Sequence, residues 1–343
     1  MVMTTSTSLT VAFVGAAHIH TPGFVGNISK RDNVSCKWVY DYDKARAEKY
    51  AAPLQGATAT DDFNAILHDD SVQAIIVCTE TDRHEQVVLP AAEAKKHLFV
   101  EKPLGFAGAD AYRMADAIEK AGVLYSTGYF QRGDSKNRFV KQQIEAGAFG
   151  KITRVRGSNC HSGALGRWFD TEWRWMADPK IAGVGAFGDL GTHSLDILLW
   201  LMGDVTSVTA QLDPGTNAYD GCDETGEGLL RFANGAIGTL AAAWDDVDNP
   251  VSLLVSGTEG HAAVINGRLH FKSSKVEGMD GSQPLRNAEL PGPESGGLDA
   301  FLDAALGKPA TLVGAHEAAY RSAVMEALYT GARESRWVAP VKA

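Results

Sequence analysis

The sequence predicts a two-domain protein: an α/β domain with a doubly wound parallel sheet in residues 1–126, then an α+β domain in residues 127–343 with a large, mostly antiparallel open sheet. The chain has 343 residues, whereas a single hydrophobic core stops growing at roughly 250–300 residues. Up to about residue 126, short β-rich runs alternate with amphipathic helical stretches. After Gly128 strands dominate, with Gly and Asn between them as hairpin turns.

Strand and helix alternate through the first half. The expected strands are 9–15, 35–41, 74–80, 97–103 and 123–129. The expected helices between them are 20–31, 43–53, 61–69, 84–96 and 109–122. Because strand–helix–strand units form right-handed crossovers, this order predicts a parallel sheet that helices cover on both faces.

The second half has a different pattern. Helices are expected at 136–147, 188–203, 298–307 and 315–332. Strands are expected at 151–163, 205–213, 227–235, 236–244, 251–258, 261–267 and 268–273. The polar, Gly- and Pro-rich stretch 273–297 is typical of a surface loop. This order predicts an antiparallel sheet with helices on one side.

Composition excludes several classes of partner. With 42 acidic and 32 basic residues, the net charge of -10 argues against binding to nucleic acid or to an anionic membrane. No stretch approaches the roughly 20 apolar residues of a membrane helix. Residues 1–10 have neither a basic region nor an apolar core, so no signal peptide is expected. We therefore predict a cytoplasmic protein.

Cysteine and histidine spacing predicts no metal site. The four cysteines form no CxxC pair and are expected to be buried thiols in a reducing compartment. His18 and His20 are interpreted as polar loop residues, because no third ligand stands at a recognisable spacing.

A phosphate site is predicted where the first strand ends, at Gly15. Such a site needs outward-pointing backbone N–H groups, a close approach of the chain and the positive end of a helix. Gly15 provides the turn, and Ala17 is small enough for a pyrophosphate to approach. His20 departs from the usual glycine pattern. However, Thr21 as N-cap and Pro22 at the first helical position let the helix begin later.

An acid at the end of the second strand completes this signature. Asp41 follows Gly15 at close to the spacing of about 20 residues at which a carboxylate meets the adenosine ribose. No Arg follows Asp41 directly, so a 2′-phosphate would be repelled there. The sequence therefore favours NAD, with NADP as the alternative coenzyme.

Two further stretches carry groups for proton transfer. Lys102 follows a buried parallel strand, and ligands of such sheets bind outside the carboxyl ends of the strands. Asp189 and His193 are four residues apart, so on a helix they share a face and can form a hydrogen bond that orients the imidazole. An oriented His can remove the proton of an alcohol while a hydride leaves the same carbon.

Together these stretches resemble the glucose–fructose oxidoreductase/inositol dehydrogenase (Gfo/Idh/MocA) family of NAD(P)-dependent dehydrogenases. The resemblance runs nearly end to end. It is carried by Gly15 and its loop, Asp41, TETDRH (79–84), KHLFVEKP (96–103), GAFGDLGTHSLD (185–196), FANGAIG (232–238) and VSGTEG (255–260). The EKP and DxGxHxxD motifs at this separation are specific as a pair.

The resemblance implies roles for individual residues. His193 would be the acid/base, Lys102 would polarise the substrate oxygen, and Asp189 would support both. Glu101 would approach the nicotinamide ribose, and the bond between Lys102 and Pro103 would be cis. The full set expected to bind the coenzyme is Gly15, Ala16, Ala17, His18, Ile19, Asp41, Thr79, Thr81, His84, Glu101 and Lys102.

A cluster of aromatic residues predicts where the substrate lies. Three of the seven tryptophans fall within residues 168–175 and could stack on a sugar ring, beside polar groups that read hydroxyls. Packing between domains is an equally good interpretation. Substrate contacts are expected from His161, Trp168, Arg174 and Trp175. With no dense Arg cluster, a neutral sugar, inositol or related polyol is favoured over a sugar phosphate.

The leading prediction is an oxidoreductase that moves a hydride between NAD(P) and a ring hydroxyl or ketone of such a substrate. One alternative is a glycoside hydrolase that retains NAD and acts by transient oxidation and elimination. Another is a non-catalytic protein that senses dinucleotides. By the resemblance, the open face of the second sheet would pack against another subunit, which predicts a homodimer or homotetramer.

Overall fold

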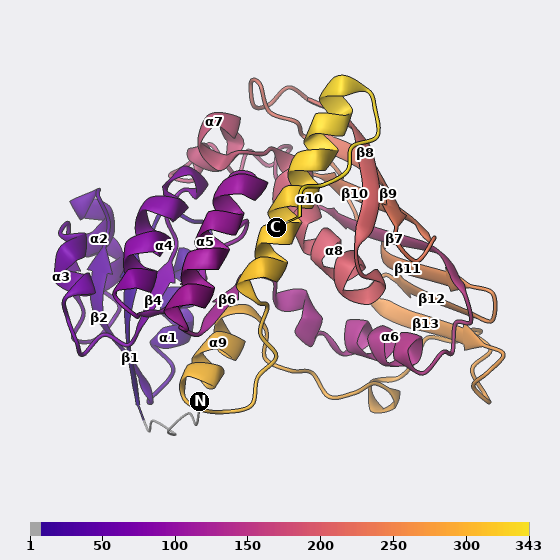
Figure 1. Ribbon diagram of the computed structural model, residues 1–343, viewed down its shortest axis with the longest axis horizontal. Helices are drawn as coiled ribbons and strands as arrows, with labels where there is room; N and C mark the ends of the chain where they lie inside the picture. The colour runs from indigo at the N-terminus through magenta and orange to yellow at the C-terminus, as the bar shows by residue number, and fades with distance from the viewer. Residues whose placement is uncertain (1–7, 343) are drawn as a thin grey trace.

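The computed structural model describes residues 8–342 and contains two sheets side by side (Figure 1). Residues 1–7, part of the segment in which no signal peptide is expected, and residue 343 lie outside the described part. The first half of the chain forms a six-stranded sheet, and the second half forms a seven-stranded sheet. The α/β and α+β halves predicted from the sequence are thus present.

The first sheet is parallel in every pairing, in the order β3-β2-β1-β4-β5-β6. Its strands are β1 (Leu9–Val14), β2 (Val34–Tyr40), β3 (Thr58–Thr60), β4 (Ala74–Val77), β5 (His97–Val100) and β6 (Tyr125–Thr127). Its helices are α1 (Thr21–Ile28), α2 (Lys44–Ala51), α3 (Phe63–Leu67), α4 (His84–Glu93) and α5 (Gly108–Ala121). The order reverses between β1 and β4, where doubly wound sheets bind their ligands.

Strand β3 was missed in the sequence. Its three residues, two of them threonines, are too short and too polar to produce an apolar period. It forms because it pairs with β2 at the edge of the sheet. By contrast, β4 is four consecutive apolar residues, all buried, as expected of a strand covered on both faces.

The second sheet has the order β13-β12-β11-β7-β10-β9-β8. Its strands are β7 (Ile152–Cys160), β8 (Val205–Asp213), β9 (Thr225–Phe232), β10 (Ile237–Ala243), β11 (Val251–Gly257), β12 (Gly260–Ile265) and β13 (Arg268–Ser273). The pair β7 and β10 is parallel and the other pairs are antiparallel. The helices of this half are α6 (Ser135–Glu145), α7 (Pro179–Ala182), α8 (Ala186–Met202), α9 (Gly297–Ala305) and α10 (Ala315–Glu334).

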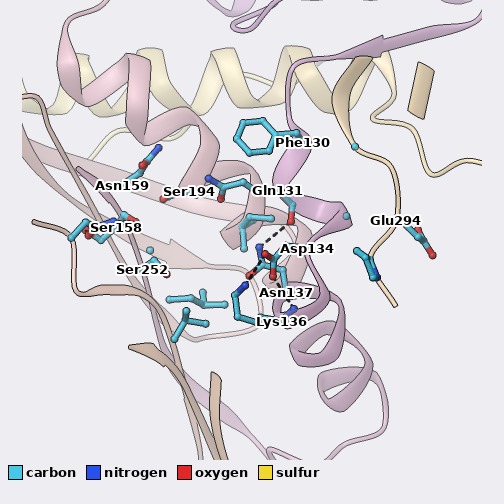
Figure 2. Close-up of a pocket in the computed structure, with 18 of the residues that line it drawn as sticks. Phe130, Gln131, Asp134, Lys136, Asn137, Ser158, Asn159, Ser194, Ser252 and Glu294 are labelled. Carbon is cyan, nitrogen blue, oxygen red and sulfur yellow. Dashed lines mark hydrogen bonds and ion pairs between the residues drawn. The ribbon is translucent and has the colours of Figure 1, made fainter. Parts of the chain in front are cut away.

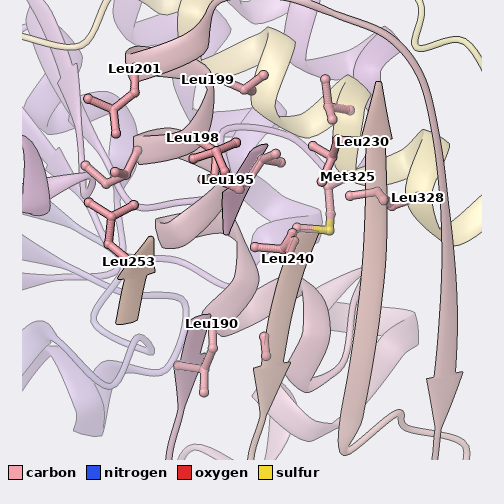
Figure 3. Close-up of a cluster of buried hydrophobic side chains, with 14 of the residues drawn as sticks. Leu190, Leu195, Leu198, Leu199, Leu201, Leu230, Leu240, Leu253, Met325 and Leu328 are labelled. Carbon is pink, nitrogen blue, oxygen red and sulfur yellow. The ribbon is translucent and has the colours of Figure 1, made fainter. Parts of the chain in front are cut away.

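Helix α8 forms the centre of the second core. Its leucines pack over β7 and β10, and Leu195 and Leu198 belong to the same buried cluster as Leu240 and Leu328 (Figure 3). The helix is buried nearly all round, which agrees with the small number of charged residues among its 17 residues. Asp189 in its first turn contacts Lys102, the second residue after β5, so α8 brings a polar residue to the end of that strand.

The last two helices also pack on the first sheet. Phe301 of α9 lies 5.9 Å from Phe99 of β5 between ring centroids, and Ala318 and Ala319 of α10 join the core that α5 covers. The two halves therefore share helices as well as a boundary. Within residues 8–342, the structure has no helix long and apolar enough to cross a membrane.

Candidate active site

The loop after β1 is shaped by Gly15. Its φ of +78° lies in the region that favours glycine, and a Cβ there would come within 2.3 Å of the Thr79 side chain. Its N–H donates to the Tyr40 carbonyl at 2.8 Å, which brings the ends of β1 and β2 together. Helix α1 begins after this loop with Pro22 in its first turn, as expected. The N-cap position is His20, however, and not Thr21 as the sequence suggested.

Unpartnered polar atoms mark the crevice at the ends of β1 and β4. Buried oxygens of Thr21, Thr79 and Glu80, and Nε2 of His84, have no hydrogen-bond partner in the described part of the chain. His84 Nδ1 bonds the Leu104 carbonyl at 3.0 Å, and burial lowers the pKa of the ring, which keeps it neutral. Buried polar groups are rarely left unpaired, so these atoms fit a polar ligand such as a dinucleotide.

Asp41 lies at the end of β2, next to the loop. Its carboxylate accepts hydrogen bonds from the backbone N–H of Ala16 at 2.8 Å and of Asp43 at 2.9 Å. Arg46 adds two more bonds, both at 2.8 Å. Arg46 was missed in the sequence, because it stands five residues after Asp41 and only the first turn of α2 brings it back against the carboxylate.

His18 and His20 lie around the buried carboxylate of Glu101. The ring of His20 is 3.1 Å from Glu101 and that of His18 is 3.9 Å away. Burial lowers the pKa of His18 to about 3, so this ring is neutral. The three side chains could in principle surround a metal ion. However, the N–H of His20 already donates to Nδ1 of His18, which leaves the proton of the neutral ring on the nitrogen that faces Glu101.

Lys102 and Asp189 form an ion pair between the two halves of the chain. Lys102 Nζ donates to Asp189 Oδ1 at 2.6 Å, and Trp244 Nε1 donates to Oδ2 at 3.2 Å. Burial would raise the pKa of Asp189, but the Lys102 ammonium outweighs it and lowers that pKa to about 2. The bond between Lys102 and Pro103 is cis. The end of β5 and the start of α8 therefore meet at one charged pair.

His193 lies one turn further along α8 and is buried. Burial, together with the Lys102 charge, lowers its pKa well below the ordinary value. Its Nδ1 has no hydrogen-bond partner within residues 8–342. The expected bond from Asp189 to His193 is not formed, and the oxygens of Asp189 accept from Lys102 and Trp244 instead. A neutral imidazole with an unused nitrogen is suited to accept a proton.

The residues expected to contact substrate lie at three different places. Trp175 donates from Nε1 to the Ala17 carbonyl at 3.0 Å, so it packs on the loop after β1. Trp168 stacks on His161 at 4.7 Å between ring centroids and remains half exposed. His161 is close enough to Asp189 and Lys102 for their charges to influence its pKa. Arg174 pairs with Asp170 on the surface and lies over the Tyr219 ring, away from Lys102.

Two residues at the site gave no signal in the sequence. Trp244 follows β10 and is fully buried, and its indole orients Asp189. Phe130 follows β6, is half exposed, and lies 5.4 Å from the His193 ring between centroids. Pairing between strands from distant parts of the chain brings each of them to the site, so no local pattern in the sequence indicates their position.

Two protein-family models match this architecture. The model of the oxidoreductase family with an NAD-binding Rossmann fold matches residues 9–129, and that of the GFO/IDH/MocA C-terminal domain matches residues 137–263. The chain belongs to the GFO/IDH/MocA family. This oxidoreductase is 31% identical to the uncharacterized oxidoreductase YrbE of Bacillus subtilis, over 71% of this chain and 70% of the relative.

Two further similarities agree with the family. Levoglucosan dehydrogenase of Pseudarthrobacter phenanthrenivorans is 29% identical over 59% of this chain, and the aligned part spans only 57% of that relative's length. A solved levoglucosan dehydrogenase in complex with NADH and levoglucosan superposes with a TM-score of 0.81 and 22% identity, covering 98% of this chain and 100% of that one. The predicted fold and family are thereby confirmed, and the family model that matches residues 9–129 confirms the oxidoreductase class and an NAD-binding domain. The domain boundary and the roles of single residues stay predictions.

Proposed function

We propose that this oxidoreductase transfers a hydride between NAD and a ring hydroxyl of a neutral sugar, inositol or related polyol. The observation that carries the proposal is the ion pair of Lys102 and Asp189, with neutral His193 one turn away. It lies beside the crevice of the parallel sheet, where unpartnered polar atoms fit a dinucleotide. The solved relative that carries NADH and an anhydrosugar supports the same substrate class.

The side chains divide the chemistry between them. Bound NAD supplies the hydride acceptor. Lys102 donates a hydrogen bond to the substrate oxygen and stabilises the negative charge that develops there. His193 accepts the hydroxyl proton, because its lowered pKa keeps the ring unprotonated near neutral pH. Asp189 holds the ammonium of Lys102 in place through the 2.6 Å contact.

Residues of the loop after β1 would hold the coenzyme. Gly15, Ala16 and Ala17 would let the pyrophosphate approach by their small size, and His18 and Ile19 would continue this wall. The outward-pointing N–H groups expected from the sequence are not available at Gly15, Ala16 and Ala17, because these donate to Tyr40, Asp41 and Cys78. Asp41 would face the adenosine ribose. The remaining contacts are proposed for Thr79, Thr81, His84, Glu101 and Lys102, which are all buried.

The test is a screen of NADH absorbance with inositols, aldoses, sugar lactones and glycosides, each with NAD and with NADP. We expect NAD reduction with at least one neutral polyol or sugar. Release of a nitrophenyl group from a glycoside, with NAD retained and no net reduction, would instead identify the hydrolase. Coenzyme binding without turnover of any compound would leave the dinucleotide sensor as the surviving alternative.

A homodimer or homotetramer is proposed from the outer face of the second sheet. Exposed and buried residues alternate along β9, and Leu229, Ile237 and Ile265 expose 39–56% of their surface on strands of this sheet. Apolar side chains on an open sheet are favourable only when another surface covers them. Light scattering after size exclusion should give twice or four times the mass of the chain. The cytoplasmic location stays a prediction.

A further inference from the structure

A cavity lined by both polar and apolar groups lies beside the proposed active site, between α6, α8 and the second sheet (Figure 2). Its volume of about 620 Å³ falls within the range of roughly 300–1,000 Å³ typical of small-molecule sites. The side chains of Gln131, Asn137, Asn159 and Ser194 line it, from the segment after β6 and from α6, β7 and α8 respectively. Leu253 and Val264 add an apolar part to the wall.

Several polar groups in this wall have spare hydrogen-bonding capacity. Within residues 8–342, the side-chain amide of Gln131 and the hydroxyl of Ser194 make no hydrogen bond to protein. Asn137 and Asn159 each donate from Nδ2 to a carbonyl, of Gln131 and Leu190, and keep Oδ1 unused. Donors and acceptors are thus both present, which suits hydroxyl groups because a hydroxyl donates and accepts.

Each charged side chain in the wall of the cavity has a partner of opposite charge. Lys136 binds Asp134 at 2.8 Å, Asp299 binds Arg31 at 2.5 Å, and Glu294 binds Arg138. No charge in this wall is therefore left to neutralise a phosphate or a carboxylate. A neutral ligand rich in hydroxyl groups fits this lining better than an anion.

The cavity adjoins the proposed site of reaction at Phe130. Ser194 directly follows His193, and Phe130 lies against the His193 ring. Phe130 also lines a second hollow, of about 400 Å³, that reaches Glu101 and His20. Its half-exposed ring stands where the two hollows meet, and such a ring can stack on the C–H face of a sugar.

We propose that this cavity binds a second sugar unit, so that the substrate is a glycoside or a disaccharide and not a free monosaccharide or inositol. One ring reacts beside Lys102 and His193, and the other occupies the cavity, where Gln131 and Asn137 bind its hydroxyls. This inference rests on the proposed function, because it assumes that the reacting molecule is a carbohydrate.

The test compares the full-length enzyme with NAD on cellobiose, maltose and lactose against D-glucose, D-galactose and myo-inositol. We expect at least a tenfold higher kcat/KM for one of the disaccharides than for any single-ring compound. In Gln131→Ala and Asn137→Ala, the KM for that disaccharide should rise about five- to tenfold, the size of one lost hydrogen bond. The matched control is Gln142→Ala on the exposed side of α6, which should leave both constants unchanged.

Two results would overturn the inference. If single-ring compounds react as well as the disaccharides, or if the variants at Gln131 and Asn137 keep the KM of the parent enzyme, the cavity holds no second sugar although the proposed function stands. If none of the six compounds is oxidised while other polyols are, the disaccharide assignment is also wrong. If no carbohydrate or polyol is oxidised at all, the proposed function fails with it.

Discussion

Two carboxylates of the same motif, Asp189 and Asp196, lie two turns apart on α8 and have different surroundings. Asp196 is 1% exposed and accepts two bonds from Arg132, at 2.6 and 2.9 Å, and one from Arg321 at 2.9 Å. Asp189 accepts from one lysine and one indole, and 14% of its side chain is exposed. Asp196 therefore joins α8 to α10 and to the segment after β6, whereas Asp189 faces the cleft.

The difference shows how one helix serves both stability and chemistry. Two guanidinium groups hold Asp196 inside the protein, and breaking such a buried pair costs more than forming it gains. At Asp189, the single ammonium of Lys102 stays within reach of the cleft, and His193 beside it keeps an unpartnered nitrogen. We therefore expect substitutions at the cleft to change turnover and substitutions at Asp196 to change stability.

The largest effect is expected at the cleft. Lys102→Ala and His193→Ala should each lower kcat/KM by about a hundredfold or more, because each removes a group that acts on the substrate oxygen or its proton. In His193→Ala, which removes no proposed coenzyme contact and no ion pair, folding and NAD binding should stay close to those of the parent enzyme. Steady-state kinetics, with circular dichroism and coenzyme titration as controls, make the measurement. Full activity in both variants would remove this site from the mechanism.

At Asp196 we expect a loss of stability instead. Asp196→Asn should lower the free energy of unfolding by about 3 kcal/mol, since the two buried guanidinium groups then keep only the more exposed Glu317 as their counter-charge. Urea unfolding measures this value. The control is Asp204→Asn, which removes an exposed pair with Lys342 and should change stability by less than about 1 kcal/mol. A stable but inactive Asp196→Asn protein would contradict the structural role.

A buried group of another kind is His18, whose titration should make the free energy of unfolding depend on pH. Its pKa is about 3 in the folded protein and near 6.5 in the unfolded chain, so between these values only the unfolded chain binds the proton. The contribution of the neutral His18 to the free energy of unfolding is then complete above pH 6.5 and is lost as the pH is lowered toward 3. In His18→Gln, the slope between pH 4 and 6 should be shallower by about 1.4 kcal/mol per pH unit.

The control for this prediction is Gln142→Ala on the exposed side of α6, which removes no titratable group. Its pH slope should equal that of the parent protein in the same urea titrations. An unchanged slope in His18→Gln would show that the folded protein binds a proton at His18 near neutral pH, contrary to its buried position.

The smallest change in kinetics is expected at Asp41. This carboxylate is paired with an arginine, as Asp196 is, but we propose that it acts in the choice between NAD and NADP. Arg46→Ala should raise the ratio of kcat/KM for NAD over NADP by about fivefold, because the bare carboxylate then repels the 2′-phosphate. Asp41→Ala should lower the same ratio. Glu48→Ala, on the exposed side of α2, is the control. A ratio that none of these variants changes would assign Asp41 to structure alone.

Much of the fold could be predicted because its elements are long and periodic. The strand 205–213 agrees with β8, and the helix expected at 188–203 lies within two residues of α8 at its N-terminal end. Short elements failed, as β3 shows, since three residues carry no period. The packing of α9 on β5 was also missed, because a helix with one apolar face does not specify which sheet it covers.

The site was predictable as a set of residues and not as a set of contacts. The motifs led to Lys102, Asp189 and His193, but the assumed bond from Asp189 to His193 is replaced by bonds to Lys102 and Trp244. Spacing along a helix shows only which residues share a face. Which of them bond depends on groups that arrive from elsewhere in the chain.

The sequence by itself determined the alternation of strands and helices, the glycine turn at the end of β1 and the presence of an acid, a base and an ammonium in recognisable motifs. These are local properties, set by backbone conformation and by apolar spacing. Only the tertiary structure decided that Asp189 meets Lys102 while Asp196 meets two arginines, that Arg46 neutralises Asp41 and that a cavity opens beside Phe130. The reason is that side-chain contacts across a cleft depend on how distant elements pack.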